Sequence, residues 1–227
     1  MGPGLWMSGD RYRENAMRLF DFALAPNPRR VRMFLAEKSV EIPLVQINTR
    51  EQEQFDESFI AVNPLSMVPV LELDDGTCIS ESVAICRYIE ELHPEPPLMG
   101  TDAKDKAIVE MWNRRVEFMG YAPASEVIRN ALPMFEDRGL SGMPGGVPQI
   151  PALVERGKQS LGRFFALLDR QLADNPFVAG KAFTIADITA FVTIEFAKRA
   201  DVVIPERDTE NVVRWHAEIA SRPSAAA

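Results

Sequence analysis

The chain has 227 residues, of which 46% are hydrophobic and 26% are charged, as is ordinary for a folded globular protein. Its formal net charge of -8 argues against binding to nucleic acid or to an anionic membrane, because both ligands attract basic surfaces. No apolar stretch approaches the roughly 20 residues that a membrane-spanning helix needs.

The cysteines and histidines do not define a disulfide framework or a metal site. Cys78 and Cys86 form no Cys-x-x-Cys pair, and we expect both to be small buried residues in a reducing cytoplasm. His93 and His216 do not complete a ligand set with these cysteines at a zinc-site spacing. The sequence therefore predicts a cytoplasmic protein with no metal, in which both histidines are structural.

The first segments of the chain alternate between strand and helix signals. We expect residues 1–16 to be a disordered extension or a tag-like segment, because they carry glycine, proline and scattered charge. Residues 18–22 alternate apolar and charged side chains and predict a first strand. Asn27 as the N-cap and Pro28 at the first helical position then predict a helix that ends near Lys38.

The next segments complete a small mixed sheet. In chain order, we predict a strand at residues 42–47, a weak polar helix at 52–62, strands at 68–73 and 77–80, and a helix at 81–92. An Asp-Asp-Gly turn joins the last two strands as a hairpin, and Ser80 is predicted to cap the helix that follows. The order β-α-β-α-β-β-α permits a parallel crossover followed by an antiparallel hairpin.

The chain becomes entirely helical after a proline-rich segment. Residues 93–100 contain the sequence His-Pro-Glu-Pro-Pro and predict a semi-rigid linker. Thr184 and Asp187 predict a capping box at the start of one later helix. The helical part has predicted helices at residues 105–130 (bent near Pro123), 153–172, 184 onward and 211–221, with a loop at 138–151. The predicted fold is an α/β domain followed by an all-α bundle.

Three sequence segments resemble the cytosolic glutathione transferases. Residues 63–71 read Asn-Pro-Leu-Ser-Met-Val-Pro-Val-Leu and residues 75–85 read Asp-Gly-Thr-Cys-Ile-Ser-Glu-Ser-Val-Ala-Ile, and both are similar to segments of the family's first domain. Residues 179–187 resemble the helix-capping signature of its second domain. The resemblance implies a thioredoxin-like, glutathione-binding βαβαββα domain at residues 17–92 and an all-helical, substrate-binding domain at residues 101–227.

The resemblance also implies a glutathione site in the first domain. Val68 and Pro69 are expected to form a cis peptide that exposes backbone groups to the cysteinyl backbone of glutathione, like an added strand. Glu81 and Ser82 are expected at a helix N-terminus, where Ser82 binds the γ-glutamyl carboxylate and Glu81 binds the ammonium group. Gln54 is expected near the glycine end. Glutathione is therefore the expected co-substrate.

The residue that activates the thiol is not the usual one. Ser-type members of the family carry a hydroxyl after the first strand, where this chain has Ala25, and no tyrosine or cysteine lies nearby. This region is similar to that of fungal and bacterial transferases that lack the usual Tyr or Ser. We therefore expect the helix start at Asn27 to stabilise the thiolate, assisted from the second domain by Tyr121 or Asn130.

The favoured function is conjugation of the glutathione thiolate to a small hydrophobic electrophile in a cleft between the two domains. The residues expected on the second-substrate side are Arg114, Glu117, Tyr121 and Arg129. One alternative is a glutathione-dependent reductase or peroxidase, although mixed-disulfide chemistry requires an active-site cysteine. The other is a non-enzymatic glutathione-binding or interaction module of the same fold. The resemblance further implies a homodimer with a role in detoxification.

Overall fold

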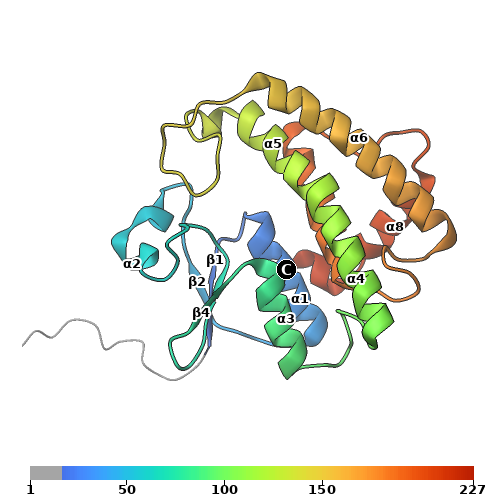
Figure 1. Cartoon of the computed structure of the whole chain (residues 1–227), viewed down its shortest axis with the longest axis horizontal. Helices are drawn as coiled ribbons and strands as arrows, with labels where there is room; N and C mark the ends of the chain where they lie inside the picture. Colours follow the sequence, from blue (N-terminus) through green and yellow to red (C-terminus); the bar gives the residue numbers. More distant parts are fainter. Residues whose placement is uncertain (1–16) are drawn as a thin grey trace, which may run out of the picture.

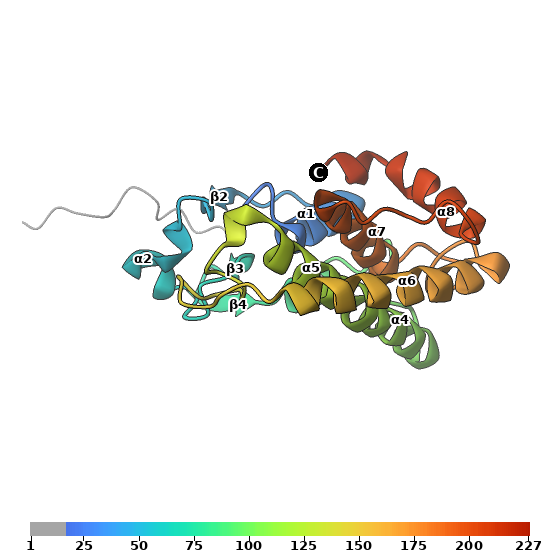
Figure 2. The same ribbon diagram turned by 90° about the horizontal axis from the view of Figure 1, so that it is seen from above.

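The computed structural model describes residues 17–227, so the predicted extension at residues 1–16 lies outside the described residues. Figures 1 and 2 show a sheet with its own helices on one side of the molecule and a bundle of longer helices on the other. This arrangement is the predicted one. Within the described residues, no helix is long and apolar enough to cross a membrane.

The sheet has the strand order β2-β1-β3-β4. β1 (Arg18–Asp21) runs parallel to β2 (Leu44–Gln46) and antiparallel to β3 (Val70–Glu72), and β3 forms a hairpin with β4 (Cys78–Ser80). The predicted mixed sheet is confirmed, although each strand is shorter than predicted. The antiparallel register aligns the first residue of β3 with the last residue of β4, so the segments just beyond these two ends are neighbours.

Side chains of β1 alternate between the two faces of the sheet. Leu19 is fully buried in the main core, which includes side chains of α1 (Pro26–Lys38) and α3 (Ser82–Leu92). Its neighbour Phe20 points to the opposite face and packs in a smaller cluster with the short helix α2 (Glu57–Ile60). The sheet is therefore covered by helices on both faces, as Figure 1 shows.

The N-terminus of α1 differs from the prediction. The helix begins at Pro26, and its N-cap is Ala25, whose φ of -86° and ψ of 140° are extended and whose side chain makes no capping bond. Asn27 therefore lies inside the first turn, and the prediction that it is the N-cap is wrong. Pro26 suits the first helical position because that position needs no N–H. Similarly, the N-cap of α3 is Glu81 and not the predicted Ser80.

The helical part opens with one long stretch that changes register. α4 (Ala103–Val116) continues through a π-helical segment (Glu117–Tyr121) into α5 (Ala122–Ala131). Pro123 lies in the first turn of α5, directly after the change of register, so the predicted interruption near this residue is confirmed. π-helical turns inside helices occur often at functional sites.

Three further helices complete the bundle: α6 (Pro151–Asp174), α7 (Ile185–Ala197) and α8 (Glu210–Ala220). α7 is buried along most of its length and packs against α1, α4 and α5. Thr184 and Asp187 form the predicted capping box at its start, so that prediction is confirmed. The buried central helix explains why this segment carries so few polar residues.

α1 joins the two sides of the molecule. It packs against α3 on one side and α7 on the other, and Figure 2 shows it between the sheet and the bundle. Near its C-terminus, Glu37 accepts two hydrogen bonds from Arg222, at 2.8 and 2.7 Å. Lys38 donates to the carbonyl oxygens of His93 and Pro96 in the connecting segment. These contacts fix α1, and therefore its N-terminus, at the boundary between the two sides.

Candidate active site

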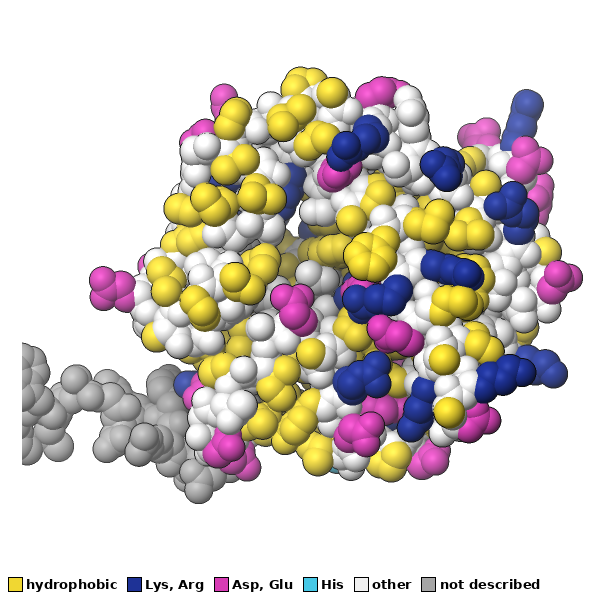
Figure 3. All heavy atoms as spheres, viewed as in Figure 1, with side chains coloured by type: hydrophobic (Ala, Val, Ile, Leu, Met, Phe, Trp, Pro, Cys, Tyr) yellow, Lys and Arg dark blue, Asp and Glu magenta, His cyan; other side chains and the backbone are white. Residues whose placement is uncertain are grey.

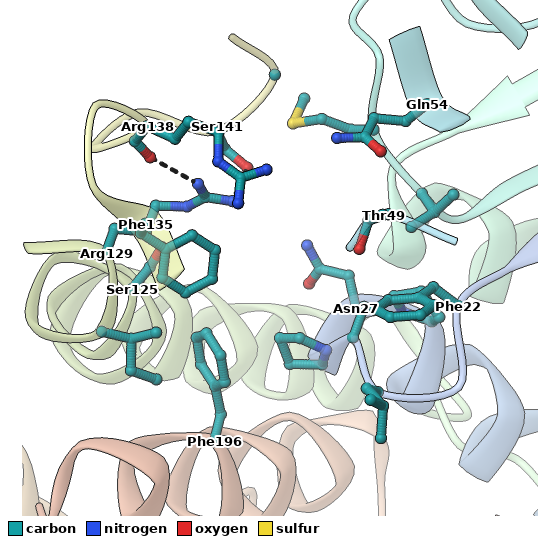
Figure 4. A pocket seen from close by; sticks show the side chains of 18 of the residues that line it. Phe22, Asn27, Thr49, Gln54, Ser125, Arg129, Phe135, Arg138, Ser141 and Phe196 are labelled. Carbon is teal, nitrogen blue, oxygen red and sulfur yellow. Dashed lines mark hydrogen bonds between the residues drawn. The ribbon is translucent and has the colours of Figure 1, made fainter. Parts of the chain in front are cut away.

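A cavity of about 410 Å³ lies at the boundary between the sheet and the helical bundle. Figure 3 shows this face of the molecule hollowed between the two sides, and Figure 4 shows the side chains around the cavity. Its wall is made by the N-terminus of α1, the segments before β3, one face of α5, the loop after α5 and the end of α7. Neither side of the molecule forms this space alone.

The first turn of α1 presents one free backbone donor to the cavity. Ala25, Pro26, Asn27 and Pro28 all line it. The two prolines have no N–H, and the N–H of Arg29 donates to the Ala25 carbonyl oxygen at 3.1 Å. The N–H of Asn27 is left without a partner in the described part of the chain, and its side-chain amide points into the cavity in Figure 4. An anionic atom at this point meets the positive end of the helix dipole.

The segment before β3 contributes free backbone groups at Val68. Ser66, Met67 and Val68 line the cavity, and the Val68–Pro69 peptide bond is cis, as predicted. Asn63 holds this turn, because its Nδ2 donates to the Met67 carbonyl oxygen at 2.8 Å. The N–H and C=O groups of Val68 form no hydrogen bond with other described residues. They are free to pair with an extended peptide, as the edge of a sheet does.

Gln54 reaches the same cavity from a short 3-10 helix, η1 (Glu53–Phe55). The residue is only 9% exposed, yet its Oε1 has no hydrogen-bond partner among the described residues. A buried amide oxygen without a partner costs free energy, so it is available to a ligand donor. Thr49 and Arg50 line the cavity beside it. In Figure 4 the side chains of Gln54, Thr49 and Asn27 lie along one side of the cavity, opposite Arg129 and Phe135.

Glu81 and Ser82 lie at the start of α3 and do not line the cavity itself. The hairpin nevertheless pairs Val70 with Ser80, so Glu81 follows Ser80 at the same end of the hairpin at which Val68 and Pro69 precede Val70. Glu81 has a φ of 69° and a ψ of 116°, a strained conformation for a residue with a side chain. Ser82 is buried, and its Oγ accepts a hydrogen bond from Nη1 of Arg30 at 2.9 Å. The hairpin therefore places Glu81 near Val68, and Ser82 follows Glu81 in the first turn of α3.

Arg30 is a buried cation that connects α1 and α3 to the π-helical segment. It is 2% exposed, and its Nη1 also lies 2.8 Å from Oε1 of Glu117. The other carboxylate oxygen of Glu117 pairs with Arg114. Neither Arg114 nor Glu117 lines the cavity. The structure therefore assigns both residues to this ion-pair network, which corrects their predicted place in the second-substrate wall.

Tyr121 lies at the junction of the π-helical segment and α5 and lines the cavity, as predicted. Its ring stacks on Phe196 with centroids 5.7 Å apart, and the guanidinium of Arg30 lies 5.4 Å from its ring centroid. Burial raises the pKa of Tyr121 to about 12, so the phenol keeps its proton near neutral pH. Its hydroxyl makes no hydrogen bond to another described residue and remains a free donor.

Asn130 does not line the cavity, contrary to its predicted role as a donor to the thiol. Its Nδ2 donates to the Glu126 carbonyl oxygen at 2.8 Å, and its Oδ1 accepts from the N–H of Ile150 at 2.8 Å. Both ends of the amide are therefore engaged in holding the segment before α6 against α5. This structural role explains why the residue is polar and buried.

Several polar residues of the cavity were not predicted from the sequence. Ser125 lines it one turn after Tyr121 and one turn before Arg129, so the 3.6-residue period of α5 is the signal that identifies it. Arg129 itself lines the cavity as predicted. Arg138 and Arg199 also line it, but they follow the ends of α5 and α7, where no periodicity marks their direction.

A thioredoxin-like sheet followed by a helical bundle, with a cavity between them, is the architecture of the glutathione transferases. The family model described as the glutathione S-transferase N-terminal domain matches residues 25–92, and the corresponding C-terminal domain matches residues 151–218. Glutathione S-transferase 2 of Saccharomyces cerevisiae is 33% identical, over 97% of this chain and 92% of the yeast protein.

Solved structures agree with these matches. A glutathione S-transferase domain-containing protein from Marinobacter aquaeolei is 35% identical with a TM-score of 0.84, over 91% of this chain and 98% of its own. A class Gtt2 glutathione S-transferase from Vibrio parahaemolyticus is 34% identical with a TM-score of 0.77, over 91% and 94% of the two chains. The chain therefore belongs to the glutathione S-transferase family and is an enzyme of the glutathione transferase type.

Proposed function

We propose that the enzyme conjugates the thiolate of glutathione to a small electrophile that binds in the cavity on an apolar surface. The observation that carries the proposal is that three unpaired groups meet in one space: the N–H of Asn27, the backbone of Val68 and the amide oxygen of Gln54. The Asn27 N–H can donate to a sulfur atom, and the Val68 backbone can pair with an extended peptide backbone. The Gln54 amide can bind a polar group at the end of that peptide. A tripeptide thiol uses all three.

The proposed position of glutathione follows from these groups. Its cysteinyl backbone pairs with Val68, which directs the sulfur toward the first turn of α1. Its γ-glutamyl end extends toward Glu81 and Ser82, where the helix dipole of α3 favours a carboxylate and Glu81 suits the ammonium group. Its glycyl end lies near Gln54.

Activation of the thiol is proposed to come from Asn27 and Tyr121, since Ala25 supplies no hydroxyl. Lowering a thiol pKa of about 8.5 by about two units requires roughly 2.7 kcal/mol in favour of the thiolate. A single hydrogen bond to a charged group contributes about 1.5–3 kcal/mol. The Asn27 N–H and the Tyr121 hydroxyl are together sufficient, and Ser125 offers a further hydroxyl on the same face of α5.

The experiment that tests the proposal is titration of the thiolate absorbance of bound glutathione against pH. We expect Asn27→Pro to raise the apparent pKa because it removes the free backbone N–H, and Tyr121→Phe and Ser125→Ala to raise it because each removes a hydroxyl that lines the cavity. Asn130→Ala is the matched control, since it removes an amide whose bonds lie outside the cavity. If the control moves the pKa and the cavity variants leave it unchanged, the proposed activation is wrong.

The reductase or peroxidase alternative receives less support from the cavity. Mixed-disulfide chemistry needs a reactive cysteine at the glutathione thiol. Among the described residues that line the cavity there is none, since Cys78 is exposed on β4 and Cys86 is buried in α3. Burial also raises the pKa of Cys86 to about 12, so its thiol stays protonated near neutral pH.

The setting of the reaction is likewise proposed from membership of the family. We expect a cytoplasmic enzyme that acts in detoxification as a homodimer and that requires glutathione as co-substrate and no metal. The described residues hold no cluster of three or more metal-ligating side chains of the His, Cys, Asp and Glu types.

A further inference from the structure

The cavity carries a surplus of positive charge in a protein that is negative as a whole. None of its described lining residues is an aspartate or a glutamate. Four of them are arginines: Arg50, Arg129, Arg138 and Arg199. The formal net charge of the whole chain is -8. No ion pair with a described carboxylate neutralises any of the four. A cluster of cations in a concave site draws in anionic ligands.

Glutathione in the proposed position does not use all of this charge. Arg50 precedes Gln54 by one short turn, so its guanidinium suits the glycyl carboxylate. The thiolate supplies a second negative charge, which disappears when the sulfur is alkylated. Two of the four positive charges are therefore left for another ligand, and this surplus is largest on the side formed by the helical bundle.

Arg129 and Arg138 form one cationic edge of the cavity. Nη1 of Arg129 donates to the Arg138 carbonyl oxygen at 3.2 Å, a contact drawn in Figure 4, and Nη2 donates to Oγ of Ser141 at 2.8 Å. The Arg129 guanidinium lies 4.9 Å from the ring centroid of Phe135. Burial lowers the pKa of Arg129, and the nearby charge of Arg138 lowers it further.

Arg199 forms a second cationic edge, after the end of α7. Its Nη1 donates to the Leu24 carbonyl oxygen at 2.6 Å, and its guanidinium lies 5.7 Å from the ring centroid of Phe196. Burial and the nearby charges of Arg29 and Arg50 lower its pKa. A guanidinium has five N–H donors in a planar fork, so bonds to backbone oxygens position the group and leave donors for a carboxylate.

Apolar and aromatic side chains line the same cavity as these two cationic edges: Phe22, Ile128, Leu132, Phe135 and Phe196. This surface suits a flat apolar body, whereas the edges suit an anionic group attached to it. We infer that the second substrate is an acidic electrophile, an aromatic or similarly flat molecule that carries a carboxylate. The inference rests on the proposed function and specifies the substrate class of the same site.

The test compares a carboxylate substrate with its uncharged ester. The probes are 4-chloro-3,5-dinitrobenzoate and its methyl ester, which share the ring, the leaving group and the site of attack. In both, the thiolate sulfur forms a bond to the ring carbon, and chloride leaves with the bonding electron pair. Each kcat/KM is divided by the rate constant for the uncatalysed reaction with glutathione, which removes the difference in intrinsic reactivity. We expect the normalised value to be about tenfold higher for the acid, the change that one charge-assisted hydrogen bond produces.

Variants locate the effect. Arg138→Gln and Arg199→Gln should each lower the normalised value for the acid by about tenfold and leave the ester nearly unchanged. The matched control is Arg163→Gln, which removes the same charge from an exposed position on α6 outside the cavity. Unchanged turnover of the ester shows that the variants fold and still activate glutathione. Equal turnover of acid and ester, or equal losses for both, overturns the inference while the proposed conjugation stands. If glutathione binds and neither probe reacts, the proposed function fails as well.

Discussion

Substituting Glu117 should destabilise the protein far more than substituting Arg30, although the two side chains are partners in one ion pair. The structural reason is an asymmetry in their other contacts. Glu117 pairs with both Arg30 and Arg114, whereas Arg30 has one carboxylate partner among the described residues. Arg30 is 2% exposed, and its Nε and Nη2 are buried with no hydrogen-bond partner in the part of the chain that the structure describes. Arg30 is therefore the member of the pair that depends on the other.

The magnitudes follow from this asymmetry. Removing one partner of a buried ion pair costs about 3–5 kcal/mol when a buried charge is left uncompensated. Glu117→Gln leaves the Arg30 guanidinium in that state, so we expect a loss in this range. Arg30→Met leaves Glu117 paired with Arg114 and fills much of the space with an apolar side chain. Replacement of a buried ion by an apolar side chain is often nearly neutral, so we expect a loss of about 1 kcal/mol.

The assay is urea unfolding followed by the fluorescence of the buried Trp112 and Trp215. Arg114→Gln is the matched control, because its half-exposed pair with Glu117 should contribute less than about 1 kcal/mol. A double variant of Arg30 and Glu117 should recover most of the loss seen with Glu117→Gln alone. The reasoning is refuted if Arg30→Met destabilises the protein as much as Glu117→Gln does.

Two further predictions concern glutathione binding and stability. Glu81→Ala should weaken glutathione binding, measured by titration calorimetry, by tenfold or more, which corresponds to about 1.4 kcal/mol. Glu91→Ala, on the exposed side of α3, is the control. Unchanged affinity in a folded Glu81→Ala variant would contradict the proposed position of glutathione. Asp187→Ala should cost about 3–5 kcal/mol in urea unfolding, because it leaves buried donors such as Nε1 of Trp215 without an acceptor. The exposed Asp174→Ala is its control, and a similar small loss for both would refute the argument.

The fold could be predicted because its strongest signals are local. The capping box at Thr184 and Asp187 can be recognised from two residues at a fixed spacing. The hairpin before α3 can be recognised from the residues of its turn. Helix and strand ends were less predictable. Two prolines near the start of α1 both suit a first turn, and the sequence does not say that Pro26, and not Pro28, is the first helical residue.

Residues of the site could be predicted only where they lie on one helix, because the helical period then fixes the direction of each side chain. Along an α-helix each residue turns by about 100°, so Ser125 lies about 40° from Tyr121, whereas Asn130 lies about 180° away. Tyr121 and Asn130 therefore cannot both face one cavity, and this geometric test identifies Ser125 in place of Asn130. Arg138 and Arg199 follow helix ends, where the direction of a side chain depends on tertiary packing and not on a period.

The proposed activation uses the start of α1 in place of a hydroxyl at Ala25. A helix N-terminus that binds a phosphate or a carboxylate presents several N–H groups to several oxygens. Here Pro26 and Pro28 remove two of these donors, and the Arg29 N–H is bonded within the helix, so Asn27 alone supplies a free N–H. One donor at the positive end of a dipole suits an anion that is a single atom. This arrangement favours a thiolate sulfur over an oxyanion at this point, and it leaves carboxylates to the arginines elsewhere in the cavity.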